Sequence, residues 1–447
     1  MSRALLAAWE KTLRRHADRP AVVQAGDGRT ATFSQLAAGA AAWRAAHIRG
    51  DELRGRAVVL ALPNGLAWLE IFLALLQAGA VVVPLDAAEP AEAQRRMAEA
   101  VRAAAWWDGA RLVPLPGARC YRDPAVCLIK LTSGSTGGPR ALVFTAAQLL
   151  ADTCHIMATM GLTSRDRNYA LIPFGHAYGL GNLVVPLLAH GVPLVCGSAP
   201  LPHAMAEDFA RWQPTVFPGV PPLWRAVVAA DAKLSGLRLG ISAGAPLPVE
   251  TARGFAEKFG GRLHGFYGSS ETGGIAYDAT GDATLAGGVG RALRGVKLKM
   301  LRGQRVQVSS AAVHTHGNRR RSGRHGAWVM PDRVARDAQG RLTVLGRRGL
   351  TVKIAGRRVN LAEITERLRQ LRGVTDVWVG VREGPEPVLG AALATARTPV
   401  DVRAELAAGT AAWRIPKHLV TLPAFPTTAR GKTDTAALRA RVFLSRG

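Results

Sequence analysis

One segment of this 447-residue chain combines glycine, hydroxyl and charged residues in a way that suits a phosphate-bearing ligand. It reads LTSGSTGGPR over 131–140 and follows an apolar run at 126–131. Glycines let backbone N–H groups approach a ligand closely, and hydroxyls add donors. The candidate phosphate-binding residues are Thr132, Ser133, Gly134, Ser135, Thr136, Gly137 and Arg140, whose guanidinium adds a fixed positive fork. The GxxxxGK[ST] pattern of P-loop proteins is absent, and an ordinary Gly/Ser turn is the alternative.

A second segment, GFYGSSETG at 265–273, could bind a base and a metal ion. The Tyr267 ring can stack on a purine, Gly268 leaves room for it, and Ser270 can donate to a phosphate. Glu271 offers the hard oxygen ligand that Mg²⁺ prefers. The alternative is a turn at the end of a strand with a solvated glutamate.

Charged residues in the last third of the chain could complete a nucleotide site. Asp332 could accept both hydroxyls of a ribose, and Arg347 could bracket the same sugar, while Arg358 lies in the basic segment KIAGRRV at 353–359. Lys432 follows a glycine in a chain that has nine lysines against 49 arginines. A compact ammonium on a flexible stem suits a charge that enters and leaves a site. A charged surface hairpin and a solvated lysine are the alternatives.

The elements that would position these residues alternate between strand and helix. Apolar runs at 57–62 and 81–83 flank the helical spacing of 66–77, which predicts a βαβ unit of a parallel sheet. Strands are expected near 170–172, 192–195, 215–217 and 237–242, with helices at 183–189, 205–212 and 248–259. Residues 302–326 lack periodicity, so a mobile surface segment is expected there. Strands at 341–345 and 376–381 and a helix at 362–371 predict a smaller α+β unit.

These elements predict an α/β protein with two domains. A large N-terminal domain at 1–345 would contain stacked mixed and parallel sheets with flanking helices. A small, mobile α+β domain at 346–447 would follow a hinge at Gly346–Gly349.

Composition narrows the class of protein. Apolar residues make up 48% and charged residues 20%, which excludes wholesale disorder. The 58 Lys and Arg against 32 Asp and Glu give a net charge of +26, but they are spread along the chain, so a nucleic-acid partner is not expected. An acidic protein partner or an arginine-rich proteome would explain the charge. Four cysteines without a CxxC pair fit a reducing cytoplasm. The sequence contains no apolar stretch of 18 residues, so a membrane span is not expected.

In this order, the segments resemble those of the adenylate-forming superfamily, which includes acyl- and aryl-CoA synthetases, adenylation domains of peptide synthetases and luciferases. LALPNG at 60–65 and AGAVVVPLD at 78–86 are similar to the N-terminal half of that superfamily. PFGHAYGL at 173–180 and SAGAPL at 242–247 are similar to its segments around the acid pocket.

The resemblance implies a role for each candidate residue. Residues 132–140 would bind the triphosphate, Tyr267 would stack on adenine, Ser270 would contact phosphate, and Glu271 would ligate Mg²⁺. The other implied roles are acid-pocket and adenine contacts for Ser242, Gly244 and Ala245, an acid-pocket role for His176, ribose contacts for Asp332 and Arg347, a nucleotide contact in the thioester-forming state for Arg358, and the adenylation role for Lys432.

The implied activity is an ATP- and Mg²⁺-dependent acid–thiol ligase. A carboxylic acid would become an acyl-adenylate with release of pyrophosphate, and the acyl group would pass to CoA or to the phosphopantetheine of an acidic acyl carrier protein. The domain at 1–345 would hold ATP and the acid, and the domain at 346–447 would act as a mobile lid. The sequence departs from the superfamily at Arg140 for Lys, Pro331 for Gly and Gly349 for the hinge Asp or Lys. The changes at Arg140 and Gly349 leave open a catalytically weakened relative that serves as a nucleotide- or acyl-binding scaffold.

The acid pocket has a chemical signature of its own. Residues 171–181 contain no Asp or Glu, so the ammonium of an α-amino acid would lack a counter-charge there. An aryl or a fatty acid is expected instead, with a preference for an aryl acid.

Overall fold

The computed structural model describes residues 3–89, 91–133, 139–314, 326–347, 351–354, 357–382, 387–409, 415–428 and 433–444. Backbone contacts divide the chain into two compact units, Met1–Met330 with Val334–Val344, and Pro331–Arg333 with Leu345–Gly447. Each unit has its own hydrophobic core. The roles expected for residues 1–345 and 346–447 stay predictions.

The first unit contains a nine-stranded sheet in the order β15-β14-β13-β12-β11-β9-β10-β1-β2. Pairing is parallel from β1 to β13 and antiparallel at both edges. The strands are β1 (Pro20–Gln24), β2 (Thr30–Thr32), β9 (Asn168–Ala170), β10 (Leu194–Cys196), β11 (Val216–Gly219), β12 (Leu239–Ser242), β13 (Leu263–Ser269), β14 (Gly273–Tyr277) and β15 (Arg291–Ala292).

A six-stranded sheet has the order β6-β5-β3-β4-β7-β8. It is parallel from β5 to β7, and β6 and β8 pair antiparallel at its edges. The strands are β3 (Ala57–Leu60), β4 (Val81–Pro84), β5 (Ala105–Trp107), β6 (Leu112–Pro114), β7 (Val126–Ser133) and β8 (Pro139–Thr145).

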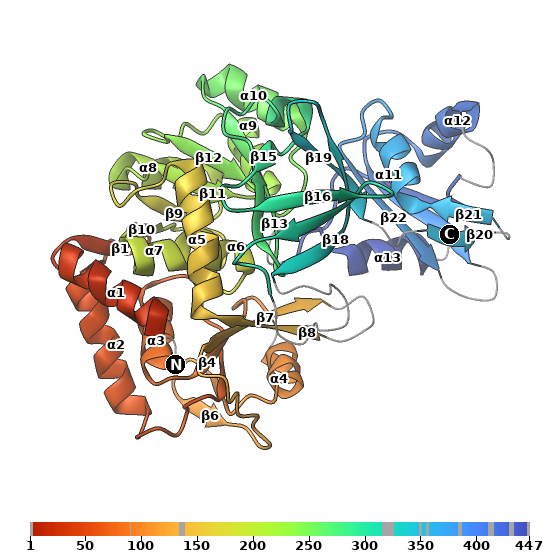
Figure 1. The fold of residues 1–447 in the computed structure, drawn as a ribbon. Coiled ribbons are helices and arrows are strands. Elements are labelled where there is room, and N and C mark those ends of the chain that lie inside the picture. The colour runs from red at the N-terminus through yellow and green to blue at the C-terminus, as the bar shows by residue number, and fades with distance from the viewer. Residues whose placement is uncertain are drawn as a thin grey trace. The chain divides into compact units, whose positions relative to one another are not determined.

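Helices cover both faces of these sheets (Figure 1). In β3, Val58 and Leu60 face one core cluster, whereas Ala57 and Val59 face another, which is the period of a strand buried on both sides. The helices are α1 (Arg3–His16), α2 (Phe33–His47), α3 (Leu66–Gln77), α4 (Ala91–Ala100), α5 (Ala146–Met160), α6 (Ala177–Gly179), the π-helix η1 (Leu180–Val184), α7 (Val185–His190), α8 (Pro202–Trp212), α9 (Pro221–Ala229), α10 (Val249–Phe259) and the 3₁₀-helix η2 (Thr284–Ala286).

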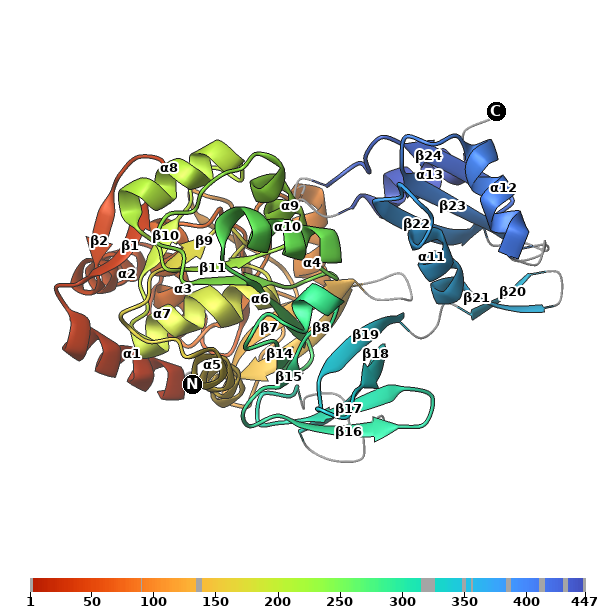
Figure 2. The same ribbon diagram turned by 90° about the horizontal axis from the view of Figure 1, so that it is seen from above.

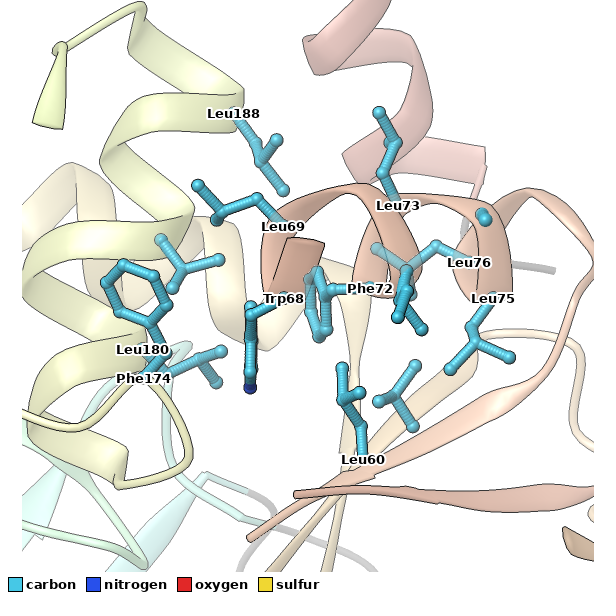
Figure 3. Packing of buried hydrophobic residues seen from close by; sticks show 14 of the residues in the cluster. Leu60, Trp68, Leu69, Phe72, Leu73, Leu75, Leu76, Phe174, Leu180 and Leu188 are labelled. Atoms are coloured by element: carbon cyan, nitrogen blue, oxygen red, sulfur yellow. The ribbon is translucent and has the colours of Figure 1, made fainter. Parts of the chain in front are cut away.

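Helix α3 packs into the largest core cluster, which draws side chains from both sheets. Figure 3 shows Trp68 and Phe72 of α3 beside Phe174 and Leu60. The Trp68 ring stacks on Phe72 with centroids 4.8 Å apart and meets the edge of Phe174 at 5.2 Å. All three rings are buried, so the segment that leads to His176 starts from a fixed position.

A four-stranded sheet, β16-β17-β18-β19, corrects the expectation for residues 302–326. Residues 305–309 form a strand whose buried Val306 and Val308 alternate with half-buried neighbours. A strand of five residues is too short for the periodicity to stand out in a long polar segment. Residues 315–325 lie outside the described part of the chain. The strands are β16 (Lys297–Leu301), β17 (Arg305–Ser309), β18 (Ala327–Arg336) and β19 (Leu342–Arg347).

In its described residues, the second unit combines short sheets with the helices α11, α12 and α13 (Figure 2). A hairpin pairs β20 with β21, and a second sheet has the order β22-β23-β24. The elements are β20 (Thr351–Ile354), β21 (Arg357–Asn360), α11 (Leu361–Arg369), β22 (Asp376–Arg382), β23 (Val388–Ala394), α12 (Pro399–Gly409), β24 (His418–Leu422) and α13 (Thr435–Phe443). The predicted α/β class, with a large first unit and a smaller α+β unit, is confirmed.

None of the helices within the described ranges is long and apolar enough to cross a membrane.

Two loops of the first unit touch at a glycine. A Cβ on Gly175 would lie 2.3 Å from the carbonyl oxygen of Leu85, in the loop after β4. Asn64 holds the same segment, because its Nδ2 donates to the Ile172 carbonyl at 2.8 Å and its Oδ1 accepts from Phe174 N–H at 2.8 Å. The segment 172–175 therefore has almost no freedom to shift.

We expect Gly175→Ala to lower the free energy of unfolding by about 1–3 kcal/mol, because the new methyl group must push two backbone segments apart. Urea unfolding followed by tryptophan fluorescence measures this loss. Gly261→Ala is the matched control, because a Cβ there meets nothing nearer than 3.7 Å. Equal stability of the two variants would contradict the tight contact.

Candidate active site

Ser242 occupies the carboxyl end of β12, where parallel strands of an α/β sheet commonly bind ligands. It pairs with Gly265 of β13, two residues before Tyr267. Ser242 is 3% exposed, and its Oγ has no hydrogen-bond partner among the described residues. Gly244 follows with a φ of +86°, which favours glycine and turns the backbone after the strand. An unpartnered buried hydroxyl at this place fits the predicted contact with a bound acid or nucleotide.

The described ends of the predicted phosphate-binding segment lie on two antiparallel strands, β7 and β8. Thr132 of β7 lies opposite Arg140 of β8. The Arg140 guanidinium lies 5.0 Å from the centroid of the Trp328 ring of β18, at cation–π distance. Residues 134–138, which include four of the candidates, and the side chain of Ser133 lie outside the described part.

The β13–β14 hairpin carries Ser270 and Glu271 in its turn. A register shift between Tyr267 and Gly268 marks a bulge, and a Cβ on Gly268 would lie 2.8 Å from the Gly273 carbonyl oxygen. Thr272 N–H donates to the Ser269 Oγ at 3.2 Å and closes the turn. Tyr267, Gly268, Ser270 and Glu271 thus come from one hairpin, as their spacing in the sequence requires.

A buried carboxylate fixes the return strand of this hairpin. Asp152 of α5 is 7% exposed, and its Oδ1 accepts the Gly274 N–H at 2.8 Å. A Cβ on Gly273 would lie 2.2 Å from the same oxygen, so only glycine fits there. Burial raises the pKa of Asp152, whereas Lys130 and the Gly274 N–H oppose that rise.

His314 joins Glu271 to the phosphate hairpin. Its backbone N–H donates to the Glu271 carbonyl at 2.8 Å, and its ring Nδ1–H donates to the Val143 carbonyl of β8 at 3.0 Å. Its ring also packs between Phe144 and Trp328, with centroids 5.5 and 6.4 Å away. Sequence reasoning missed His314, because it lies 171 residues from Val143 and no local pattern marks it.

His176 has a buried acidic partner that sequence reasoning also missed. The ring Nε2–H donates to Asp86 Oδ2 at 2.9 Å, and Asp86 Oδ1 accepts the Ala88 N–H at 2.9 Å. The Asp86 carboxylate is 6% exposed, whereas the imidazole is 29% exposed. The pairing fixes the ring orientation and leaves Nδ1 for another partner. A lone carboxylate directly after the apolar strand β4 was the available signal.

The remaining candidates are placed only in part. Asp332 lies in β18 and is 6% exposed. Gly244 and Ala245 are exposed beyond β12. Arg347 ends β19 and Arg358 lies in β21, but their side chains are outside the described part, as is Lys432.

A divalent cation at Glu271 would depend on ligands other than the described His, Cys, Asp and Glu side chains. Among the described residues, no three His, Cys, Asp and Glu side chains gather as a metal site. One carboxylate plus phosphate oxygens and water is the usual way in which proteins hold Mg²⁺ on a nucleotide. The residues present therefore fit a metal that arrives with its nucleotide.

A surface hollow of about 480 Å³ is lined by other residues. Its lining includes Gln148, Lys297, Ser309 and Gly326 and none of the candidate site residues. It therefore adds nothing to the candidate site.

Comparison with known proteins gives relatives across the chain. A feruloyl-CoA synthase from Amycolatopsis is 29% identical over 223 residues, covering 44% of this chain and 45% of that protein. The p-hydroxybenzoic acid–AMP ligase FadD22 of Mycobacterium tuberculosis is 28% identical over 388 residues, covering 80% of this chain and 54% of that protein. The chain thus spans about half the length of these curated relatives.

Solved structures share the fold. ATP-bound MatB from Rhodopseudomonas palustris superposes with a TM-score of 0.80 at 20% identity, covering 97% of this chain and 98% of the other.

A profile of the family described as AMP-binding enzyme matches residues 9–116 and 118–310. This match covers well over half of the chain, and the protein therefore belongs to the AMP-binding enzyme family, the adenylate-forming superfamily.

Proposed function

We propose that this protein is an acid–thiol ligase that forms an acyl-adenylate. ATP and a carboxylic acid would yield the acyl-adenylate and pyrophosphate. A thiol would then attack the mixed anhydride, giving the thioester, AMP and a proton. The overall reaction balances without any oxidant or reductant.

One observation carries the proposal. The hairpin with Thr132 and Arg140 and the turn with Glu271 are joined through His314, so the residues suited to phosphates and to Mg²⁺ lie in one part of the first unit. A separate surface hairpin or a solvated turn would need no such link. Family membership supplies the fold for this chemistry.

The first step would rely on positioning and on charge. Thr132 and Arg140 would orient the phosphates, and Glu271 would share Mg²⁺ with them. Lys432, outside the described residues, would reach the attacking carboxylate and the α-phosphate. Mg²⁺, when bound, would neutralise charge on the phosphate oxygens as pyrophosphate leaves.

We assign the acid to the aryl class. The feruloyl-CoA synthase and the p-hydroxybenzoic acid–AMP ligase are named for aromatic acids. Tyr178 lies near the Phe266 ring, with centroids 5.9 Å apart, and Val185 and Leu180 are buried beside its helix. Residues 171–181 contain no Asp or Glu, and the neighbouring carboxylate of Asp86 is already bonded to His176 and to the Ala88 N–H, which disfavours an α-amino acid.

Either CoA or an acyl carrier protein could supply the thiol, and the net charge of +26 supports an acidic carrier. The scaffold alternative rests on Arg140, whose guanidinium lies on Trp328. An arginine fork does not reproduce the point charge of the lysine usual in the family.

Isotope exchange between pyrophosphate and ATP tests the proposed function. We expect exchange only when a member of a panel of aryl and fatty acids is present, and mass spectrometry should detect the matching adenylate. ATP binding without exchange for any acid would favour the scaffold.

We expect Lys432→Ala to slow adenylate formation by about a hundredfold or more, because one positioned cation is removed from the developing charge. Thioester formation from preformed acyl-adenylate should stay close to that of the unaltered protein. Rapid-quench assays of the two half-reactions measure both. Lys417→Ala, at an exposed lysine of the same unit, is the control. Equal losses in both steps would contradict separate lid positions for the two steps.

Ionic strength should separate the two acceptors. Raising NaCl from about 0.05 to about 0.5 M should slow transfer to an acidic carrier protein by about three- to tenfold, because screening removes long-range attraction. Transfer to CoA should change less, and transfer to uncharged pantetheine should serve as the baseline. Carrier transfer as insensitive to salt as pantetheine transfer would argue against charge-steered docking.

A further inference from the structure

The second step of the proposed reaction releases a proton for which no acceptor has been named. A thiol has an ordinary pKa of about 8.5, so it keeps its proton near neutral pH, whereas the thiolate is the form that attacks. The carboxylic acid and ATP react as anions and have no such proton to lose. A base in the site would therefore act on the thiol alone among the three reactants.

The imidazole of His176 has one nitrogen engaged and the other available. Its Nε2 lies 2.9 Å from Asp86 Oδ2, and because a carboxylate can only accept, the proton of the neutral ring lies on Nε2. Nδ1 then carries the lone pair, and no described residue donates a hydrogen bond to it. The imidazole is 29% exposed, so a ligand can reach this nitrogen. An accessible lone pair is what a base needs.

Asp86 is suited to support the charge that such a base acquires. Its carboxylate is 6% exposed, and it also accepts the Ala88 N–H at 2.9 Å, which fixes its orientation. When Nδ1 takes up a proton, the ring becomes an imidazolium, and the buried negative charge beside Nε2 offsets the new positive charge. A histidine held by a carboxylate in this way is a common means of activating a nucleophile.

The register of the nine-stranded sheet brings this pair to the candidate site. Strands β9, β11 and β12 are parallel neighbours, and their pairing sets Leu171 level with Ser242. The two residues are two strand spacings apart, each of about 4.8 Å. His176 follows Leu171 in a loop that Asn64 holds at two backbone positions. The loop of His176 therefore leaves the sheet at the same edge as Ser242.

We propose that His176 is the base of the thioester-forming step and that Asp86 is its positioning residue. Nδ1 takes the thiol proton while the sulfur bonds to the acyl carbon. The bond from that carbon to the phosphate oxygen breaks, AMP leaves with the electron pair, and the imidazolium then gives its proton to water. The inference rests on the proposed function, because the acyl-adenylate must form first.

Separate assays of the two half-reactions test the proposal. Pantetheine, which carries the thiol of both possible acceptors, is the probe for transfer from preformed acyl-adenylate, and pyrophosphate exchange reports adenylate formation. His176→Gln keeps an N–H for Asp86 but removes the base, so transfer should slow by about a hundredfold or more. Asp86→Asn should slow transfer by about tenfold or more, because the amide lacks the charge. In each variant, this loss should exceed the loss in adenylate formation by at least about tenfold.

Two further measurements separate the base from a packing role. If Asp86 acts through His176, adding Asp86→Asn to His176→Gln should change transfer by less than about twofold. The deficit of His176→Gln should also narrow between about pH 7 and pH 9.5, because the thiol then ionises without help. His203→Ala, at an exposed histidine of the same unit, is the control and should transfer as the unaltered protein does.

The possible outcomes distinguish the two levels of the argument. Equal losses in both half-reactions, or a deficit that stays constant with pH, would show a packing role and overturn the assignment of the base. If His176→Gln does not fold, the split between the half-reactions in Asp86→Asn still decides. Pyrophosphate exchange in the unaltered protein, with transfer unaffected by either variant, overturns the base alone. Absence of exchange with every acid overturns the proposed function itself.

Discussion

The arrangement of the candidate site depends on the buried carboxylate of Asp152 and on the glycine at position 273, which has no side chain to displace it. Asp152 accepts the Gly274 N–H from within the core, and Gly273 has no room for a Cβ beside the same oxygen. A carboxylate in this setting tolerates little movement, because a lost hydrogen bond leaves charge unsolvated. The turn that carries Ser270 and Glu271 inherits that rigidity.

A second set of contacts extends this rigidity to the phosphate hairpin. His314 bonds to Glu271 through its backbone and to Val143 through its ring. The Phe144 ring lies 5.5 Å from the ring of His314, centroid to centroid, and its centroid lies 4.3 Å from the Lys130 Nζ. Contacts with packed strands and with α5 thereby hold the hairpins that carry the candidate residues. Such rigid support suits a reaction that depends on the positions of its reactants.

Local patterns predicted most of the elements but not the contacts between them. The helix at 66–77 has the bounds of α3, because an apolar run long enough for a helix is bounded by Gly65 and closely followed by Gly79. The strand expected at 170–172 lies instead at 168–170, because the apolar run continues into a buried loop whose Ile172 carbonyl is held by Asn64. The strand at 305–309 was missed because five residues are too few for the alternation of buried and half-buried side chains to stand out in the sequence.

The residues of the site also divide into those with a local sequence pattern and those whose partners are distant in the sequence. Those with local signatures, such as Thr132, Tyr267 and Glu271, could be named from the sequence, and their roles stay predictions. Asp86 and Asp152 could not, because their partners lie 90 and 122 residues away. Their local signs were a carboxylate directly after an apolar strand, at Asp86, and a carboxylate within the helical segment 146–160, at Asp152.

The contact between Asp152 and Gly273 also restricts how this sequence can vary. Any residue larger than glycine at 273 demands a shorter side chain at 152, and a shorter side chain at 152 gives up the acceptor for the 274 amide. We therefore expect positions 152 and 273 to vary together. Aligned homologues should change them together or not at all, and a designer who recombines α5 from one relative with the β13–β14 hairpin of another must transplant both.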